Sequence, residues 1–248
     1  MKLMKRIVMI VGGKGGTGKT ALTRLEVDEL HTQGIKYIAY DADTENPELY
    51  EYYQSFGHGV RLLNFLEVAE AKRFFSEIKA ESPDVVVIDM PGASGNKTRE
   101  IITKFGLFKI ANDLGYRVTL VTVLNLGFSA ITSMKTMVDF CEERVDYVVV
   151  KNLCWDKGMG FGRWDHSQTK LMVTELKGVE IELPELEDST FDLLIEKSLP
   201  YSLATEENGV PFGDYLLVSA FLDRARLELH KAGIYLGLTV ESTKRKAK

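Results

Sequence analysis

The sequence has few cysteines, the residues that cross-link small secreted domains and bind soft metals. Its 248 residues include only two cysteines, Cys141 and Cys154, which lie far apart and form no C-x-x-C pair. This usage indicates neither a disulfide framework nor a cysteine-based metal or iron–sulfur site. A reducing, cytoplasmic compartment is therefore the location that we expect.

Long apolar runs and a basic charge balance are also absent. No stretch approaches the roughly 20 apolar residues that a membrane-spanning helix needs. The formal net charge of -5 argues against binding nucleic acid through overall charge, but leaves a local basic patch open. Residues 1–11 have a basic start and an apolar run, which is too short for a signal peptide and meets no small-residue cleavage site. We expect these residues to hold the first strand.

The chain does contain enough apolar sequence for one sizeable core. Hydrophobic residues make up 45% of the chain and charged residues 27%, which is the balance of a globular α/β domain. Nothing in the composition marks a second domain. We expect a single domain over residues 1–235 and a basic tail over residues 236–248, which ends in Lys-Arg-Lys-Ala-Lys.

A glycine-rich motif with two lysines directly follows the apolar run of residues 7–11. It consists of Gly13, Lys14, Gly15, Gly16, Thr17, Gly18, Lys19 and Thr20. The motif fits G-x-x-x-x-G-K-[ST], in which backbone N–H groups of a loop and of the next helix converge on phosphate. We expect Lys19 to neutralise the β- and γ-phosphates and the Thr20 hydroxyl to ligate Mg²⁺. A structural turn without a ligand is the alternative.

The second lysine of the motif, Lys14, goes beyond the general pattern. The variant Lys-Gly-Gly-x-Gly-Lys-Thr resembles the deviant Walker A motif of the ParA/MinD family of P-loop ATPases. In that family the extra lysine reaches across an ATP-sandwiched dimer, so the resemblance implies a catalytic role for Lys14 at a partner's nucleotide. An ordinary solvated lysine is the alternative. In many family members the residue after this motif is Thr or Ser, which contacts the α-phosphate. This chain has Ala21 at that position, so only a backbone N–H is available there.

Two aspartates follow a buried strand over residues 37–40. Asp41 and Asp43 should therefore lie at the carboxyl edge of the sheet, where open α/β folds bind ligands. The resemblance implies that Asp43 orients the attacking water and that Asp41 supports the Mg²⁺ site. Two turn-forming aspartates are the alternative. Residues 44–47 depart from the sequences of both the plasmid-partition and the septum-positioning branches.

A third aspartate ends the continuous apolar run of residues 84–89. A buried parallel strand that carries a carboxylate at its carboxyl end is what a Walker B element needs, so we expect Asp89 to hold Mg²⁺ through a water. Gly92 and Gly95 leave the following loop free to change shape with the γ-phosphate, as in the family's second switch.

Apolar runs alternate with amphipathic segments along the chain. This order predicts an α/β fold with a mostly parallel, twisted sheet and helices on both faces. The resemblance implies a P-loop NTPase of the SIMIBI type. Expected strands cover residues 37–40, 84–89, 117–124, 145–150 and 179–184. Expected helices cover residues 21–32, 62–79, 97–112, 129–142 and 212–230.

Asn152 follows the strand over residues 145–150. In the ParA/MinD family an asparagine at this place recognises adenine, and a side-chain amide suits that task because it offers a donor and an acceptor. The Asn/Thr-Lys-x-Asp signature of GTPases is absent. We therefore expect ATP and Mg²⁺ as cofactors.

Three further segments leave two interpretations open. The aromatic residues of 50–56 could form a partner surface, although packing beneath a loop is the more ordinary explanation. Residues 154–166 could contact the nucleotide base or a partner, or could simply pack. The basic tail could touch DNA or anionic lipid, or could be a disordered, solubilising end.

The resemblance favours an ATP-dependent dimeric switch nearest the plasmid partition and plasmid transfer branch. It implies a homodimer, slow partner-stimulated hydrolysis of ATP, a DNA-binding adaptor protein as partner and optional contact with non-specific DNA. We expect no membrane contact. A metabolic ATP-dependent ligase and a non-hydrolysing, nucleotide-dependent adaptor remain as alternatives.

Overall fold

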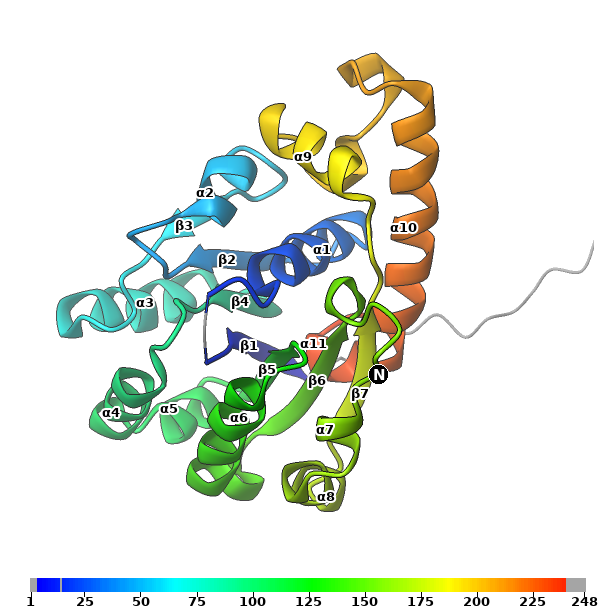
Figure 1. Ribbon diagram of the computed structural model, residues 1–248. Helices are drawn as coiled ribbons and strands as arrows, with labels where there is room; N and C mark the ends of the chain where they lie inside the picture. Colours follow the sequence, from blue (N-terminus) through cyan, green and yellow to red (C-terminus); the bar gives the residue numbers. More distant parts are fainter. Residues whose placement is uncertain (1–3, 14, 240–248) are drawn as a thin grey trace, which may run out of the picture.

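The computed structural model describes residues 4–13 and 15–239, and these contain a seven-stranded sheet whose pairs are all parallel (Figure 1). The strands are β1 (Lys5–Val11), β2 (Tyr37–Asp41), β3 (Val60–Leu62), β4 (Val85–Asp89), β5 (Tyr116–Leu124), β6 (Asp146–Asn152) and β7 (Val179–Leu183). Their order in the sheet is β3-β2-β4-β1-β5-β6-β7. The expected α/β fold with a parallel sheet is thus confirmed.

Helices cover both faces of this sheet (Figure 1). One face carries α1 (Lys19–Thr32), α2 (Glu48–Tyr53), α9 (Asp188–Glu196), α10 (Phe212–Lys231) and α11 (Gly233–Leu236). The other face carries α3 (Val68–Glu81), α4 (Gly95–Phe105), α5 (Leu107–Asp113), α6 (Phe128–Cys141), α7 (Gly162–Asp165) and α8 (Gln168–Glu175).

The two layers of helices explain why the strands are apolar on both sides. Along β1, Ile7 and Met9 enter one core, whereas Val8 and Ile10 enter the other. The chain passes from β4 on one side of β1 to β5 on the other. The carboxyl end of β1 therefore lies where the direction of winding changes, which is the usual ligand position of an open α/β sheet.

Two expected helices are wrong in their bounds. Residues 62–79 do not form one helix, because Val60–Leu62 pairs with β2 as β3 and α3 begins only at Val68. Residues 97–112 form two helices, because Gly106 adopts a left-handed φ of 61° that ends α4 at Phe105. The first error arises because a strand pairs across the sheet inside an apolar periodic segment. The second arises because a helix-ending glycine lies inside such a segment.

The aromatic segment of residues 50–56 packs into the core. Tyr53 and Phe56 are buried, while Tyr50 and Tyr52 lie partly buried against the same cluster. The packing interpretation is therefore confirmed for this segment.

The last residues described continue the packed domain. Leu236 and Leu238 are buried, and a Cβ at Gly237 would stand 2.4 Å from Val85. The division at residue 235 remains a prediction, and the basic residues 244–248 lie outside the described part of the chain. Among the helices of residues 4–13 and 15–239, none is long and apolar enough to cross a membrane.

Candidate functional site

The phosphate loop leaves the carboxyl end of β1 and passes into α1. Gly16 and Gly18 have φ values of 74° and 98°, a conformation that favours glycine. Gly18 precedes the first residue of α1, Lys19, and no side chain caps this end of the helix. The first N–H groups of α1 are thus available to an anion. Lys14, to which we assign a catalytic role, lies outside the described residues.

Asn152 holds the phosphate loop from the end of β6. Its amide nitrogen donates a 2.9 Å hydrogen bond to the Thr17 carbonyl, and its amide oxygen accepts from the Cys154 N–H at 3.3 Å. The contact is close, because a Cβ at Gly18 would stand 2.3 Å from the same amide nitrogen. Adenine recognition by Asn152 remains a prediction, and the structure shows the residue in contact with the loop backbone.

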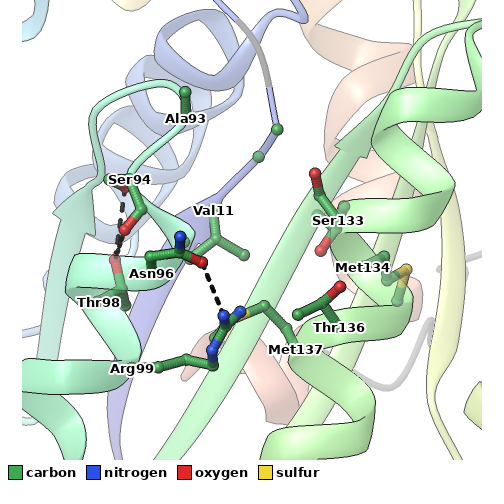
Figure 2. Close-up of a pocket in the computed structure, with 14 residues that line it drawn as sticks. Val11, Ala93, Ser94, Asn96, Thr98, Arg99, Ser133, Met134, Thr136 and Met137 are labelled. Atoms are coloured by element: carbon green, nitrogen blue, oxygen red, sulfur yellow. Dashed lines mark hydrogen bonds between the residues drawn. The ribbon is translucent and has the colours of Figure 1, made fainter.

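A cleft of about 240 Å³ lies beside the start of the loop, between α4 and α6 (Figure 2). On one wall, a Cβ at Gly13 would stand 2.3 Å from the Ser133 hydroxyl oxygen, so only glycine lets the loop run this close to α6. On the other wall, Asn96 accepts a 2.7 Å hydrogen bond from Arg99 (Figure 2). The cleft thus leaves space between the phosphate loop and the segment that follows β4.

Thr20 and Asp89 meet at the mouth of the loop. The Thr20 hydroxyl donates a 2.8 Å hydrogen bond to one carboxylate oxygen of Asp89, which is 3% exposed. Its other oxygen is buried and has no hydrogen-bond partner among residues 4–13 and 15–239. Burial raises the pKa of Asp89 to about 7; the bond from Thr20 opposes this shift, while the charge of Asp41 adds to it.

Asp41 stands opposite Asp89 in the register of β2 and β4. It is buried and accepts 3.0 Å hydrogen bonds from the N–H groups of Asp43 and Tyr50. Burial raises its pKa to about 6, against the effect of these hydrogen bonds. Asp41 therefore shapes the loop that carries Asp43 and fixes the start of α2.

Asp43 lines a second cavity, of about 480 Å³, which shares Ala93 and Ser94 with the first cleft. Gly15, Gly92 and Lys97 also line it. The structure thus brings the proposed water-orienting carboxylate together with the phosphate loop and the segment after β4. Lys97 was not among the expected site residues, although a cation eight positions after the Walker B carboxylate was a visible signal.

The chain is similar in sequence or in fold to known proteins. No family model matches the chain. Protein MobD of Acidithiobacillus ferrooxidans is 25% identical over 226 residues, which cover 90% of this chain and 96% of MobD. A chain of the MinC:MinD cell division protein complex of Aquifex aeolicus matches with a TM-score of 0.55 and 20% identity, over 90% of this chain and 95% of that chain.

The septum site-determining protein MinD of Pyrococcus horikoshii, solved as a complex with Mg-ADP, has a TM-score of 0.51 and 20% identity, over 94% of this chain and 99% of its own. The chain has the fold of MinD. The resemblance to the ParA/MinD family that the motifs predict is thereby confirmed.

The donor set at the phosphate loop fits a magnesium nucleotide. Mg²⁺ prefers hard oxygen ligands, and the unpartnered oxygen of Asp89 stands beside the Thr20 hydroxyl. The Thr17 hydroxyl is also buried without a partner. Within the described residues, no three His, Cys, Asp or Glu side chains gather as a metal site. Phosphate and water would supply the remaining ligands of a bound Mg²⁺.

Lys19 is the cation of this candidate site. Its side chain is buried against the loop, where a Cβ at Gly12 would stand 3.2 Å from its Cδ. It forms no ion pair with a carboxylate of the described residues. A buried cation at the start of a helix, without a carboxylate partner, is suited to a phosphate.

Proposed function

We propose that the chain is an ATP-dependent switch that binds Mg-ATP in the loop of residues 13–20, dimerises on it and hydrolyses it slowly. The observation that carries this proposal is the buried, unpartnered oxygen of Asp89 beside the Thr20 hydroxyl, at the open N-terminal end of α1. A buried carboxylate oxygen without a partner is costly unless a cation or water occupies the place next to it.

Each side chain of the site then has a task. Lys19 and the loop N–H groups bind the phosphates, and Thr20 and Asp89 hold Mg²⁺, with Asp41 in support. When bound, Mg²⁺ neutralises charge on the phosphate oxygens. Asp43, which lines the 480 Å³ cavity, orients the attacking water, and Asn152 keeps the loop in place. Lys14 acts on the nucleotide of the second protomer.

The process that we propose is partition, positioning or conjugative maintenance of a plasmid, together with a partner protein. The match to MobD along 90% of the chain supports this choice. A MinD protein is found in a complex with MinC, which supports a protein partner for a chain of this fold. We propose a DNA-binding adaptor as that partner and the cytoplasm as the location.

The dimer is tested by sedimentation velocity with Mg-ATP and with Mg-ADP. We expect the wild-type chain to dimerise with ATP only, and Lys14→Ala to remain monomeric while it still binds ATP. Lys72→Ala, which removes an exposed lysine of α3, should dimerise as the wild type does. An unchanged sedimentation profile and turnover for Lys14→Ala would remove the argument from the second lysine.

Hydrolysis is tested by phosphate release from the Asp43→Ala variant. If Asp43 orients the water, this variant binds ATP and stays in the ATP-bound dimer, because only the chemical step is lost. Ordinary hydrolysis by the variant would place water orientation elsewhere. Co-sedimentation of the wild-type ATP dimer with DNA and with anionic liposomes then shows whether the chain binds DNA directly.

A further inference from the structure

The N-terminal half of α10 is apolar on both its buried and its exposed side. Val218, Phe221 and Leu222 pack into the core, whereas Phe212 and Leu216 are 58% and 49% exposed. Leu217 of the same helix and Leu203 of the 3₁₀ turn Tyr201–Leu203 are also exposed. A helix that is apolar all round is normally buried all round, so the exposed side is suited to a partner.

This apolar surface, formed by Leu203, Phe212, Leu216 and Leu217, lies next to α9. The hydroxyl of Thr190 in α9 donates a 2.6 Å hydrogen bond to Asp214 in α10. Figure 1 shows α9 and the first turns of α10 together at one end of the domain. The surface is thus held on two joined helices.

Carboxylates are frequent in the segment that contains α9 and the first residues of α10. Residues 185–214 contain eight acidic side chains and one basic side chain, Lys197. The acidic ones are Glu185, Glu187, Asp188, Asp192, Glu196, Glu206, Glu207 and Asp214. None of these eight forms an ion pair within the part of the chain that the structure describes. Leu217 lines one open groove together with three of these carboxylates, Glu185, Glu187 and Asp188, and one cation, Arg224. The Arg224 guanidinium donates a 3.2 Å hydrogen bond to the Glu185 carbonyl, so the carboxylates still outnumber the cation there.

The charge decides between possible occupants. A two-fold dimer through this surface would set its carboxylates against their own copies, which is unfavourable. DNA phosphates and anionic lipid are repelled for the same reason. We propose that the surface docks a basic amphipathic helix of a partner protein, whose apolar side covers Phe212, Leu216 and Leu217 and whose lysines or arginines meet the carboxylates.

The surface also has a path to the nucleotide site. Arg24 of α1 donates a 3.0 Å hydrogen bond to the Leu199 carbonyl, and its guanidinium lies over the rings of Phe191 in α9 and Tyr201. A partner helix docked on α9 and α10 would therefore contact α9, which itself contacts α1, the helix that follows the phosphate loop. In this way the inference deepens the proposed function, because it gives the partner a place and a charge.

The test uses two synthetic peptides of about 18 residues, long enough to form a helix, one built from Leu and Lys and its counterpart from Leu and Glu. Binding to the wild-type chain is measured by fluorescence anisotropy at low salt and without nucleotide, so that a failure of the ATPase proposal leaves this result interpretable. We expect the Lys peptide to bind and the Glu peptide not to bind, and we expect added salt to weaken the binding.

Variants locate the contact. Leu216→Ser with Leu217→Ser should weaken Lys-peptide binding at least about tenfold, and Glu185→Lys with Asp188→Lys should do the same. Leu227→Ser, at a 68% exposed leucine near the other end of α10, is the matched control and should bind as the wild type does. Because the changed side chains are exposed, we expect all variants to fold, and thermal melts verify this.

Three results would overturn the proposal. The first is equal binding of the Glu peptide, or equal loss in Leu227→Ser. The second is self-association of the wild-type chain that Leu216→Ser with Leu217→Ser abolishes, which would assign the surface to a second copy. The third is binding to anionic vesicles that the same variants abolish, which would assign the surface to lipid.

Discussion

Gly18 shows at the scale of one residue how tightly the phosphate loop is built. Its φ of 98° is a conformation that disfavours any residue with a Cβ. In addition, a Cβ at this position would stand 2.3 Å from the Asn152 amide nitrogen, so there is no space for a side chain. The motif predicts a glycine here for the sake of the phosphate. The structure adds a second reason, which is the approach of β6 to the back of the loop.

Gly18→Ala should therefore weaken ATP binding at least about tenfold, because the strained φ alone costs about 1–2 kcal/mol. Isothermal titration calorimetry with Mg-ATP measures this loss. Gly162→Ala is the control, since its Cβ would meet nothing within 4 Å and its φ is not positive. Wild-type affinity in Gly18→Ala would show that the loop does not need the Asn152 contact.

Glu26 is a residue to which no motif points. It lies on α1, fully buried, and neither of its carboxylate oxygens has a hydrogen-bond partner within the described part of the chain. Burial raises its pKa from 4.5 to about 8. The folded chain thus keeps a proton that the unfolded chain releases, so this group lowers the free energy of unfolding as the pH rises from 4.5 to about 8.

Glu26→Gln should remove that dependence, because Gln does not titrate. At pH 8 the variant should exceed the wild type in free energy of unfolding by an amount on the order of a few kcal/mol, and the gap should close toward pH 5. Denaturant unfolding at several pH values measures this. The exposed Glu100→Gln is the control; a gap that does not change with pH would show that Glu26 is ionised when folded.

At the scale of elements, a buried polar cluster joins α1, α2 and the turn Tyr201–Leu203. Asp28 accepts hydrogen bonds from the Tyr53 hydroxyl at 2.5 Å and from the Tyr201 N–H at 3.1 Å. Arg24 lies over the rings of Tyr53 and Tyr201. The segment that follows Asp43 is therefore anchored to the helix that follows the phosphate loop.

Tyr53→Phe should lower the free energy of unfolding by about 1–2 kcal/mol, because it leaves a buried carboxylate with one donor fewer. Asp28→Ala should lower it by more, about 2–4 kcal/mol, since the buried Tyr53 hydroxyl and the Tyr201 N–H then both lose their acceptor. Chemical denaturation measures both changes. Tyr52→Phe, whose hydroxyl has no hydrogen bond within the described residues, is the control; equal losses in the two Tyr variants would contradict the role of the cluster.

Elements with a long apolar run could be predicted from the sequence, and short ones could not. β4 and β5 are mostly apolar strands that are buried on both faces. β3 has only three residues and owes its form to pairing with β2, and α2 has six residues whose start depends on Asp41. Such elements are specified by contacts across the fold, which a single sequence does not display.

At the scale of the whole molecule, the order of elements predicted both the fold and the place of the site. The loop, Asp41, Asp43 and Asp89 follow three different strands, and parallel strands bring their carboxyl ends to one edge. The cluster of Arg24 and Asp28, the buried Glu26 and the apolar surface on α10 could not be predicted. Their roles depend on which neighbours the fold places against them.

Whether the loop of residues 13–20 binds Mg-ATP is best tested by calorimetric titration of Mg-ATP into the wild-type chain and into Lys19→Ala. Lys19 is buried at the start of α1 and forms no ion pair with a carboxylate of residues 4–13 and 15–239. We expect Mg-ATP to bind saturably to the wild type and not measurably to Lys19→Ala. Near-normal affinity of Lys19→Ala for ATP would contradict this expectation.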